Sequence, residues 1–185
     1  MNIYCSWLPK ESQINLNNLP SEIDLAYNVF CNDFISSTPT FNGFPVRVRR
    51  YPEDKQKNRY FSFNHITTKD YSRINNKNSS EYTKREPDIR RIERIAWVRK
   101  IIEHPVCSPK LECNCEGIKT WYEEYKGTYR VNIMLESENF MIVLEKENKD
   151  AEFYLLITAF YFNNDYEKNK WIKKYNSSTY KPLKL

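Results

Sequence analysis

The segment 118–162, IKTWYEEYKGTYRVNIMLESENFMIVLEKENKDAEFYLLITAFYF, decides the fold. Its four apolar and aromatic runs, separated by short polar stretches, predict strands at 118–125, 129–135, 140–144 and 153–162. Strands joined by short connections usually pair with their neighbours along the chain. The segment therefore predicts a four-stranded antiparallel sheet with the topology of a meander, in which the last and most apolar strand is central.

The stretch before this sheet, PDIRRIERIAWVRKIIEHP at 87–105, predicts one helix that begins at Asp88 and ends near Glu103. On a helical wheel, its apolar residues form a packing stripe. Three arginines share the adjoining arc: Arg90, Arg91 and Arg94. Arginines held beside a core face are suited to binding a phosphate group. The alternative is a solvated basic face, paired with neighbouring glutamates.

The front half of the chain predicts a helix at 21–34 and a basic β-hairpin. In 44–49 apolar residues alternate with Arg47 and Arg49, which would place the arginines on the outer face of a strand. The aromatic run at 59–66 predicts the second strand of the hairpin. We therefore expect an α+β fold, in which helices pack on the antiparallel four-stranded sheet and a helix and hairpin extend it.

At 185 residues, the chain predicts a single domain. Its expected parts are an N-terminal extension (1–20), a helix and basic hairpin (21–66), a mobile polar loop (67–86), a helix–sheet–helix core (87–176) and a tail (177–185).

Composition narrows the possible functions. Only 3 glycines are present, which excludes the glycine-rich phosphate loops of nucleotide-triphosphate enzymes. The net charge of +5 is modest, but the arginines are clustered, and clustered cations attract the backbone of a nucleic acid. We find no apolar stretch that would span a membrane, and we expect a cytoplasmic protein whose 5 cysteines are reduced.

Three kinds of side chain are candidates for chemistry. His65 could transfer protons near neutral pH, although a structural histidine at the end of a strand is the simpler interpretation. Thr158 could bind phosphate or could be an ordinary packed strand threonine. A zinc site is a weaker possibility, because the spacing of its ligands is imperfect. Its four soft ligands would be His104, Cys107, Cys113 and Cys115.

The succession PDIRRIERIAWVRKIIEHP, WYEEYKGTYRVNIML, NFMIVLE and FYLLITAFY resembles the phage-type branch of the barnase, EndoU, colicin-nuclease and RelE-like superfamily, the BECR fold. The resemblance covers roughly residues 27–175. It implies a sheet whose concave face binds RNA and cuts it without a metal or other cofactor, by attack of the ribose 2′-hydroxyl.

The resemblance also implies roles for residues. His65 would handle protons, Arg90 and Arg94 would hold the scissile phosphate, and Thr158 would fix the phosphate or a neighbouring side chain. The residues expected to contact RNA, possibly tRNA, are Arg47, Arg49, Arg91, Lys126 and Arg130.

The implied cellular role is that of a toxin or a phage- or plasmid-type effector, restrained by an antitoxin or immunity protein. Two positions depart from the family pattern: Tyr51 replaces a frequent histidine, and Phe160 replaces the tyrosine of the last strand. The alternative is therefore a noncatalytic protein of the same fold that binds nucleic acid or inhibits a host defence.

Overall fold

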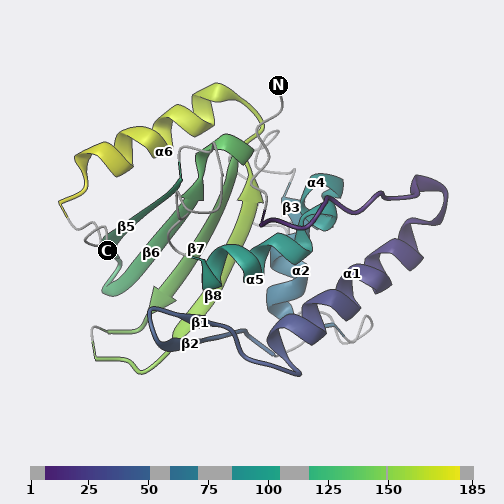
Figure 1. Cartoon of the computed structure of the whole chain (residues 1–185), viewed down its shortest axis with the longest axis horizontal. Coiled ribbons are helices and arrows are strands. Elements are labelled where there is room, and N and C mark those ends of the chain that lie inside the picture. The colour runs from purple at the N-terminus through teal and green to yellow at the C-terminus, as the bar shows by residue number, and fades with distance from the viewer. Residues whose placement is uncertain (1–6, 51–58, 71–84, 105–116, 149, 180–185) are drawn as a thin grey trace, which may run out of the picture.

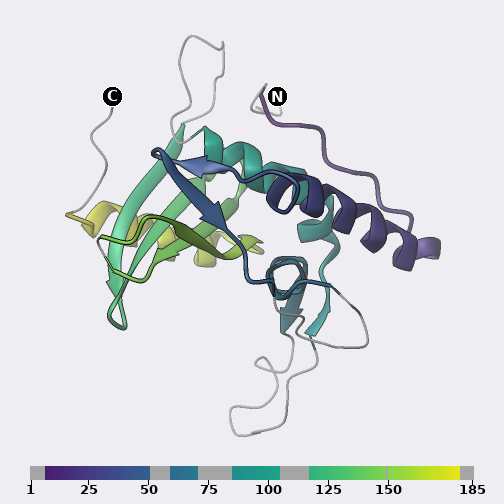
Figure 2. The same ribbon diagram turned by 90° about the horizontal axis from the view of Figure 1, so that it is seen from below.

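The computed structural model describes five stretches of the chain: residues 7–50, 59–70, 85–104, 117–148 and 150–179. They form an α+β fold in which a curled sheet has helices on both faces (Figure 1). Helix α6 lies on one face, and the other helices lie on the opposite face or beside the sheet (Figure 2). The predicted α+β class is confirmed.

The four predicted strands of the meander are all present. They are β5 (Ile118–Tyr125), β6 (Thr128–Leu135), β7 (Phe140–Lys146) and β8 (Tyr154–Tyr161), and each pairs antiparallel with the next. The β5–β6 connection is a tight turn in which Lys126 and Gly127 both have positive φ, as a two-residue hairpin turn requires. The meander was predictable because its apolar runs and turn residues agree.

The sheet itself is larger than predicted. Two further strands, β1 (Thr40–Phe41) and β2 (Phe44–Arg47), extend it to six in the order β1-β2-β8-β7-β6-β5. Strand β2 pairs parallel with β8, so the sheet is mixed, and the prediction of a four-stranded antiparallel sheet is wrong. The reason is that the meander leaves one edge of β8 open, and β2 pairs with it at Tyr154 and Leu155.

The predicted basic hairpin is also wrong. Segment 59–66 contains helix α2 (Phe61–Thr67), while β2 pairs with β1 and β8. The buried residues of α2 recur at helical spacing, and they are Ser62, Phe63, Ile66 and Thr67. Helix α2 packs beside β8. A backbone bond from Ser62 N to Arg49 O (3.3 Å) fixes its start against the chain that leaves β2.

The segment predicted as a mobile loop, 67–86, begins and ends in structure. Strands β3 (Thr68–Asp70) and β4 (Arg85–Pro87) pair antiparallel as a separate two-stranded sheet. The polar residues between them lie outside the described residues, as does the tail beyond 179.

The predicted arginine-rich helix is two helices, α4 (Ile89–Glu93) and α5 (Ile95–Glu103), with Arg94 between them in a non-helical conformation. Asp88 caps α4 as predicted, since its side chain accepts a hydrogen bond from Arg91 N. The chain begins with a 3-10 turn (Leu16–Asn18) and helix α1 (Leu19–Phe34), two residues earlier than predicted. A second 3-10 turn (Glu136–Glu138) joins β6 to β7.

Two apolar cores stabilise the fold, one on each face of the sheet. On the first face, α1 and α5 bury residues such as Phe30, Trp97 and Ile101 against the strands. On the second, α6 (Asp165–Ser177) rests on a smaller cluster that includes Trp121 and Phe162. Helix α6 has no fully buried residue, so its docking is shallow compared with that of α5. No helix among the described stretches has the length and apolar character to cross a bilayer.

Candidate functional site

His65 lies in the last turn of α2, beside the open part of the β8 edge. Its imidazole stacks on the ring of Phe61, with centroids 5.8 Å apart and planes inclined by 7°. Burial, together with the smaller effects of the charges of Arg85, Arg91 and Arg49, lowers the pKa of His65 from 6.5 to about 4. The side chain is therefore neutral at pH 7, which is the state a general base requires.

Two arginines bind the carboxyl end of α2. Arg85 Nη2 donates to Thr68 O (2.8 Å) and to His65 O (3.1 Å), and Arg91 Nη1 donates to Thr68 O (3.0 Å). The last carbonyls of a helix have no partner within it, and the negative end of its dipole favours cations. These bonds hold two guanidinium groups beside His65 through carbonyl acceptors. Arg91 is also paired with a carboxylate, since its Nε lies 3.6 Å from Asp88 Oδ2.

Arg49 is the third arginine whose charge acts on His65. Its backbone N donates to Ser62 Oγ (2.8 Å), and its guanidinium carbon lies 5.6 Å from the centre of the Phe61 ring. We call His65, Arg49, Arg85 and Arg91 the His65 cluster. It joins three separate stretches of the chain, from the end of β2, helix α2, and the β4–α4 region.

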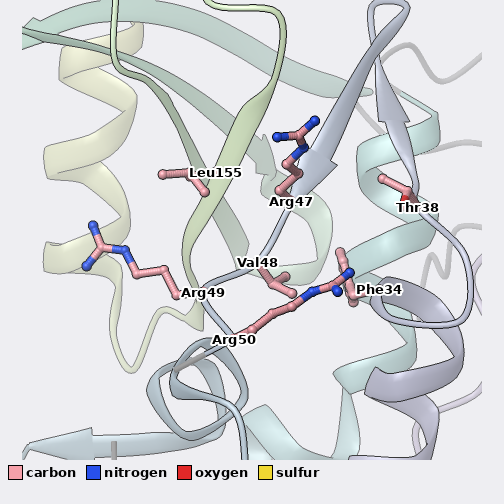
Figure 3. Close-up of a pocket in the computed structure, with 7 residues that line it drawn as sticks. All are labelled: Phe34, Thr38, Arg47, Val48, Arg49, Arg50 and Leu155. Atoms are coloured by element: carbon pink, nitrogen blue, oxygen red, sulfur yellow. The ribbon is translucent and has the colours of Figure 1, made fainter. Parts of the chain in front are cut away.

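An arginine-lined hollow of about 760 Å³ adjoins the His65 cluster (Figure 3). Its lining residues are Phe34, Thr38, Arg47, Val48, Arg49, Arg50 and Leu155. The side chains of Arg49 and Arg50 point to opposite sides, and Arg47 points away from both (Figure 3). The three cations are therefore spread along the hollow, an arrangement that fits successive phosphates of a chain better than one small anion.

Arg94 is placed differently from the cluster. Its Nη2 lies 2.5 Å from Glu11 Oε1 and its Nη1 3.3 Å from Glu93 Oε2, and the residue is buried. Its Nη1 also donates to Arg90 O (2.8 Å). The guanidinium groups of Arg90 and Arg94 both lie over the ring of Tyr161, at 5.1 and 4.9 Å. The charge of Arg94 is thus balanced by two carboxylates.

Thr158 lies on the other face of the sheet from that Tyr161 ring. Thr158 pairs with Val143, whose side chain belongs to the core beneath α6. A bulge just before this pair moves Leu156 to the opposite face, where it belongs to the same core as Ala159. The structure therefore does not bring Thr158 together with Arg90 and Arg94, although the sequence resemblance groups them.

The two remaining residues expected to contact RNA lie near the far edge of the sheet. Lys126 is in the β5–β6 turn, and Arg130 in β6 is paired with Glu145 (Nε to Oε2, 2.9 Å). Both cations lie over the ring of Tyr125, at 5.4 and 3.6 Å. Strand β7 lies between the strand of Arg130 and β8, so the predicted RNA contacts divide into two groups.

The possible zinc ligands can be followed only in part. His104 is exposed, stacks on Trp7 with centroids 5.2 Å apart, and has Nδ1 2.9 Å from Lys100 O. The three cysteines, Cys107, Cys113 and Cys115, lie outside the described residues, and so does Tyr51. Within the described part of the chain, no group of three or more potential metal ligands is found.

Three cations that adjoin the site are not among the predicted site residues: Arg50, Lys69 and Arg85. Arg50 and Arg85 belong to the basic clusters of the sequence, and Arg50 continues the run of Arg47 and Arg49. Arg85 and Lys69 come to the site only because β3 pairs with β4, which a polar loop prediction hides.

Comparison with known proteins adds no constraint, since no family model, no curated protein and no solved structure matches this chain.

Proposed function

We propose that the protein is a metal-independent endoribonuclease whose reaction takes place at the His65 cluster. The observation that carries this proposal is a half-buried imidazole, stacked on Phe61, with three arginines around it. Cleavage by a ribose hydroxyl needs a base for that hydroxyl and positive charge for the phosphate. His65 supplies the first, and Arg49, Arg85 and Arg91 supply the second.

The proposed reaction is an internal transfer at phosphorus. Neutral His65 takes the proton of the 2′-hydroxyl as the 2′ oxygen bonds to the adjacent phosphorus atom. The bond from phosphorus to the 5′ oxygen breaks, and that oxygen takes a proton from water. The products are a 2′,3′-cyclic phosphate and a 5′-hydroxyl. The arginines stabilise the negative charge that builds on the phosphate oxygens.

The RNA backbone would lie along the arginine-lined hollow. Arg47, Arg49 and Arg50 are all exposed there, and exposed arginines bind phosphates with release of counterions. A protein partner with an acidic surface that covers this hollow would restrain the enzyme, as the proposed toxin role requires.

A second candidate is a noncatalytic RNA-binding protein that uses the same hollow. Two observations favour it: Thr158 lies on the opposite face of the sheet from Tyr161, and Arg94 is paired with Glu11 and Glu93. If cleavage requires all four residues that the family resemblance groups, this arrangement binds RNA without cutting it.

One experiment separates these functions. The pure protein, His65→Ala and the matched surface control Lys173→Ala are incubated with total tRNA and with a fluorescent RNA in EDTA. If the protein is an endoribonuclease, the wild type and the control cut RNA at the same rate. His65→Ala cuts RNA at least 100-fold more slowly, which is the typical loss when a general base is removed. Intact RNA in every tube contradicts the enzyme proposal. Retention of intact RNA that disappears with added salt then supports the second candidate.

A further inference from the structure

A second hollow, of about 390 Å³, lies where β3, helix α4, the end of β8 and the first half of α6 meet. In Figure 1, the chain leaves the end of β8 and turns directly into α6 there. Its volume is within the range of roughly 300 to 1,000 Å³ that is usual for small-molecule sites. It is separate from the arginine-lined hollow, and the two share no lining residue.

Aromatic rings form one part of its lining: Phe160, Tyr166 and Trp171. Phe160 and Trp171 contact each other, with ring centroids 5.9 Å apart, and both pack against the core beneath α6. Tyr166 is different, because 82% of it is exposed. The fold gains little from a ring so exposed, and a flat exposed ring at the mouth of a hollow is suited to stacking on another ring.

Positive charges form another part of the lining, from Lys69, Arg91 and Lys170. One acidic residue, Glu167, also lines the hollow, but its carboxylate accepts a hydrogen bond from Asn163 N (3.1 Å). Arg91 is paired with Asp88, whose Oδ2 lies 3.6 Å from Arg91 Nε. The lining still has more basic than acidic side chains next to aromatic rings, a combination that recognises a nucleotide by its base and its phosphate.

This hollow is continuous with the His65 cluster through Arg91. The guanidinium of Arg91 lines the hollow, donates to Thr68 O (3.0 Å), lies 6.0 Å from the Phe160 ring and lowers the pKa of His65. An RNA strand bound at the His65 cluster would therefore place its neighbouring nucleotides at this hollow.

We propose that this second hollow binds one nucleotide of a single-stranded RNA, with the base stacked on Tyr166 and its phosphate beside Lys69, Arg91 and Lys170. The inference rests on the proposed function, because it takes RNA as the ligand. It adds that the RNA is unpaired where it meets the protein, since a stacked base cannot remain in a duplex.

The test compares two ligands that differ only in their bases. One is a fluorescent 2′-O-methyl pentanucleotide, which has no free 2′-hydroxyl and stays intact, and the other is an abasic phosphodiester of the same length. We expect wild type to bind the first more tightly, by about tenfold, which is the typical contribution of one stacked base. Tyr166→Ala removes that difference, and Tyr166→Phe retains it.

Lysine variants test the charged part of the site. Lys170→Ala is expected to weaken binding of both ligands, whereas Lys173→Ala, an exposed lysine of the same helix outside the hollow, leaves both unchanged. All four substitutions are on the exposed surface or keep the ring, so circular dichroism should confirm an unchanged fold.

The outcomes distinguish the two proposals. Equal binding of both ligands by wild type, with RNA still cut, overturns the nucleotide site and leaves the ribonuclease standing. If wild type binds the ligand with bases more tightly, Tyr166→Ala removes that difference and no RNA is cut, the nucleotide site is supported and the ribonuclease proposal is overturned. If wild type binds neither ligand and cuts no RNA, both proposals fail.

Discussion

The two groups of arginines near β8 differ in what balances their charge. In the His65 cluster, Arg85 and Arg91 donate to backbone carbonyls, and Arg49 lies over an aromatic ring. Arg91 also lies 3.6 Å from the carboxylate of Asp88. Arg94 instead has two carboxylates within 3.3 Å and is buried. Carbonyls and rings orient a cation without cancelling its charge. Arg49 and Arg85 therefore keep charge available for a phosphate, and Arg94 serves mainly to anchor the N-terminal segment.

That anchor is visible in the backbone as well. Segment 7–15 lies along the α4–α5 junction, where Ser12 N donates to Glu93 O (3.0 Å) and Trp97 Nε1 donates to Pro9 O (2.8 Å). Glu11 adds its contact with Arg94. An arginine that sequence alone suggests for catalysis thus has a structural role in the fold.

The largest expected effect is on catalysis. Replacing His65 with alanine should slow RNA cleavage by about 100- to 10,000-fold, because the general base is lost, while RNA affinity changes little. Single-turnover cleavage and fluorescence anisotropy measure the two quantities. A variant that cuts at the wild-type rate would show that His65 is a structural histidine.

The next effect is on stability. Arg94→Ala should lower the free energy of unfolding by about 3 kcal/mol, because it breaks a buried ion pair and leaves Glu11 and Glu93 without their partner. Urea denaturation measures this, with Arg90→Ala as the matched control, since Arg90 is exposed and neighbours the same tyrosine ring. Equal stability of both variants would contradict the structural role of Arg94.

A smaller effect is expected on RNA affinity. Arg49→Ala should weaken RNA binding. It should also make binding less dependent on salt: the slope of log binding constant against log salt concentration should decrease in magnitude by about one. Titrations at several salt concentrations measure this slope. Arg94→Ala should leave it unchanged if its charge is already neutralised, and a reduced slope for Arg94→Ala would contradict that view.

His65 should make the free energy of unfolding depend on pH. Because the pKa of His65 falls from 6.5 to about 4 on folding, the unfolded chain binds more protons than the folded one between these pH values. Stability from this group is complete above pH 6.5 and is lost as the pH falls toward 4. Between pH 7 and 5, wild type should lose more unfolding free energy than His65→Gln, as urea titrations can measure.

The smallest effect is expected at the far edge of the sheet. Lys126→Ala should change RNA affinity by less than about twofold, because one exposed lysine away from the backbone path contributes only a weak screened attraction. A loss as large as that of Arg49→Ala would show that RNA also reaches the β5–β6 turn.

Local sequence was sufficient for the meander and for the cap of α4. Strands β5 to β8 follow from their apolar runs, and Asp88 caps α4 as its position indicates. Local sequence failed at 59–66, where a run of aromatics suits both a strand and a helix. The environment decides there: Phe63 and Ile66 are buried on one side of a short helix beside β8.

The sequence predicted which residues belong to the candidate site better than it predicted which of them lie together. His65, Arg49 and Arg91 were singled out by sequence, and the structure brings all three together with Arg85. Thr158 is separated from Arg90 and Arg94 because side chains alternate along β8, which places Thr158 and Tyr161 on opposite faces of the sheet.

The sequence by itself determined the α+β class, the meander and the presence of a basic surface, since all three depend on patterns within a few residues. Tertiary structure decided that β2 joins the sheet in parallel with β8 and that the aromatic run is a helix. It also decided which arginines have carboxylate partners. These features depend on partners distant in the chain, such as Glu11 with Arg94 and Arg49 with His65, and no local pattern encodes such contacts.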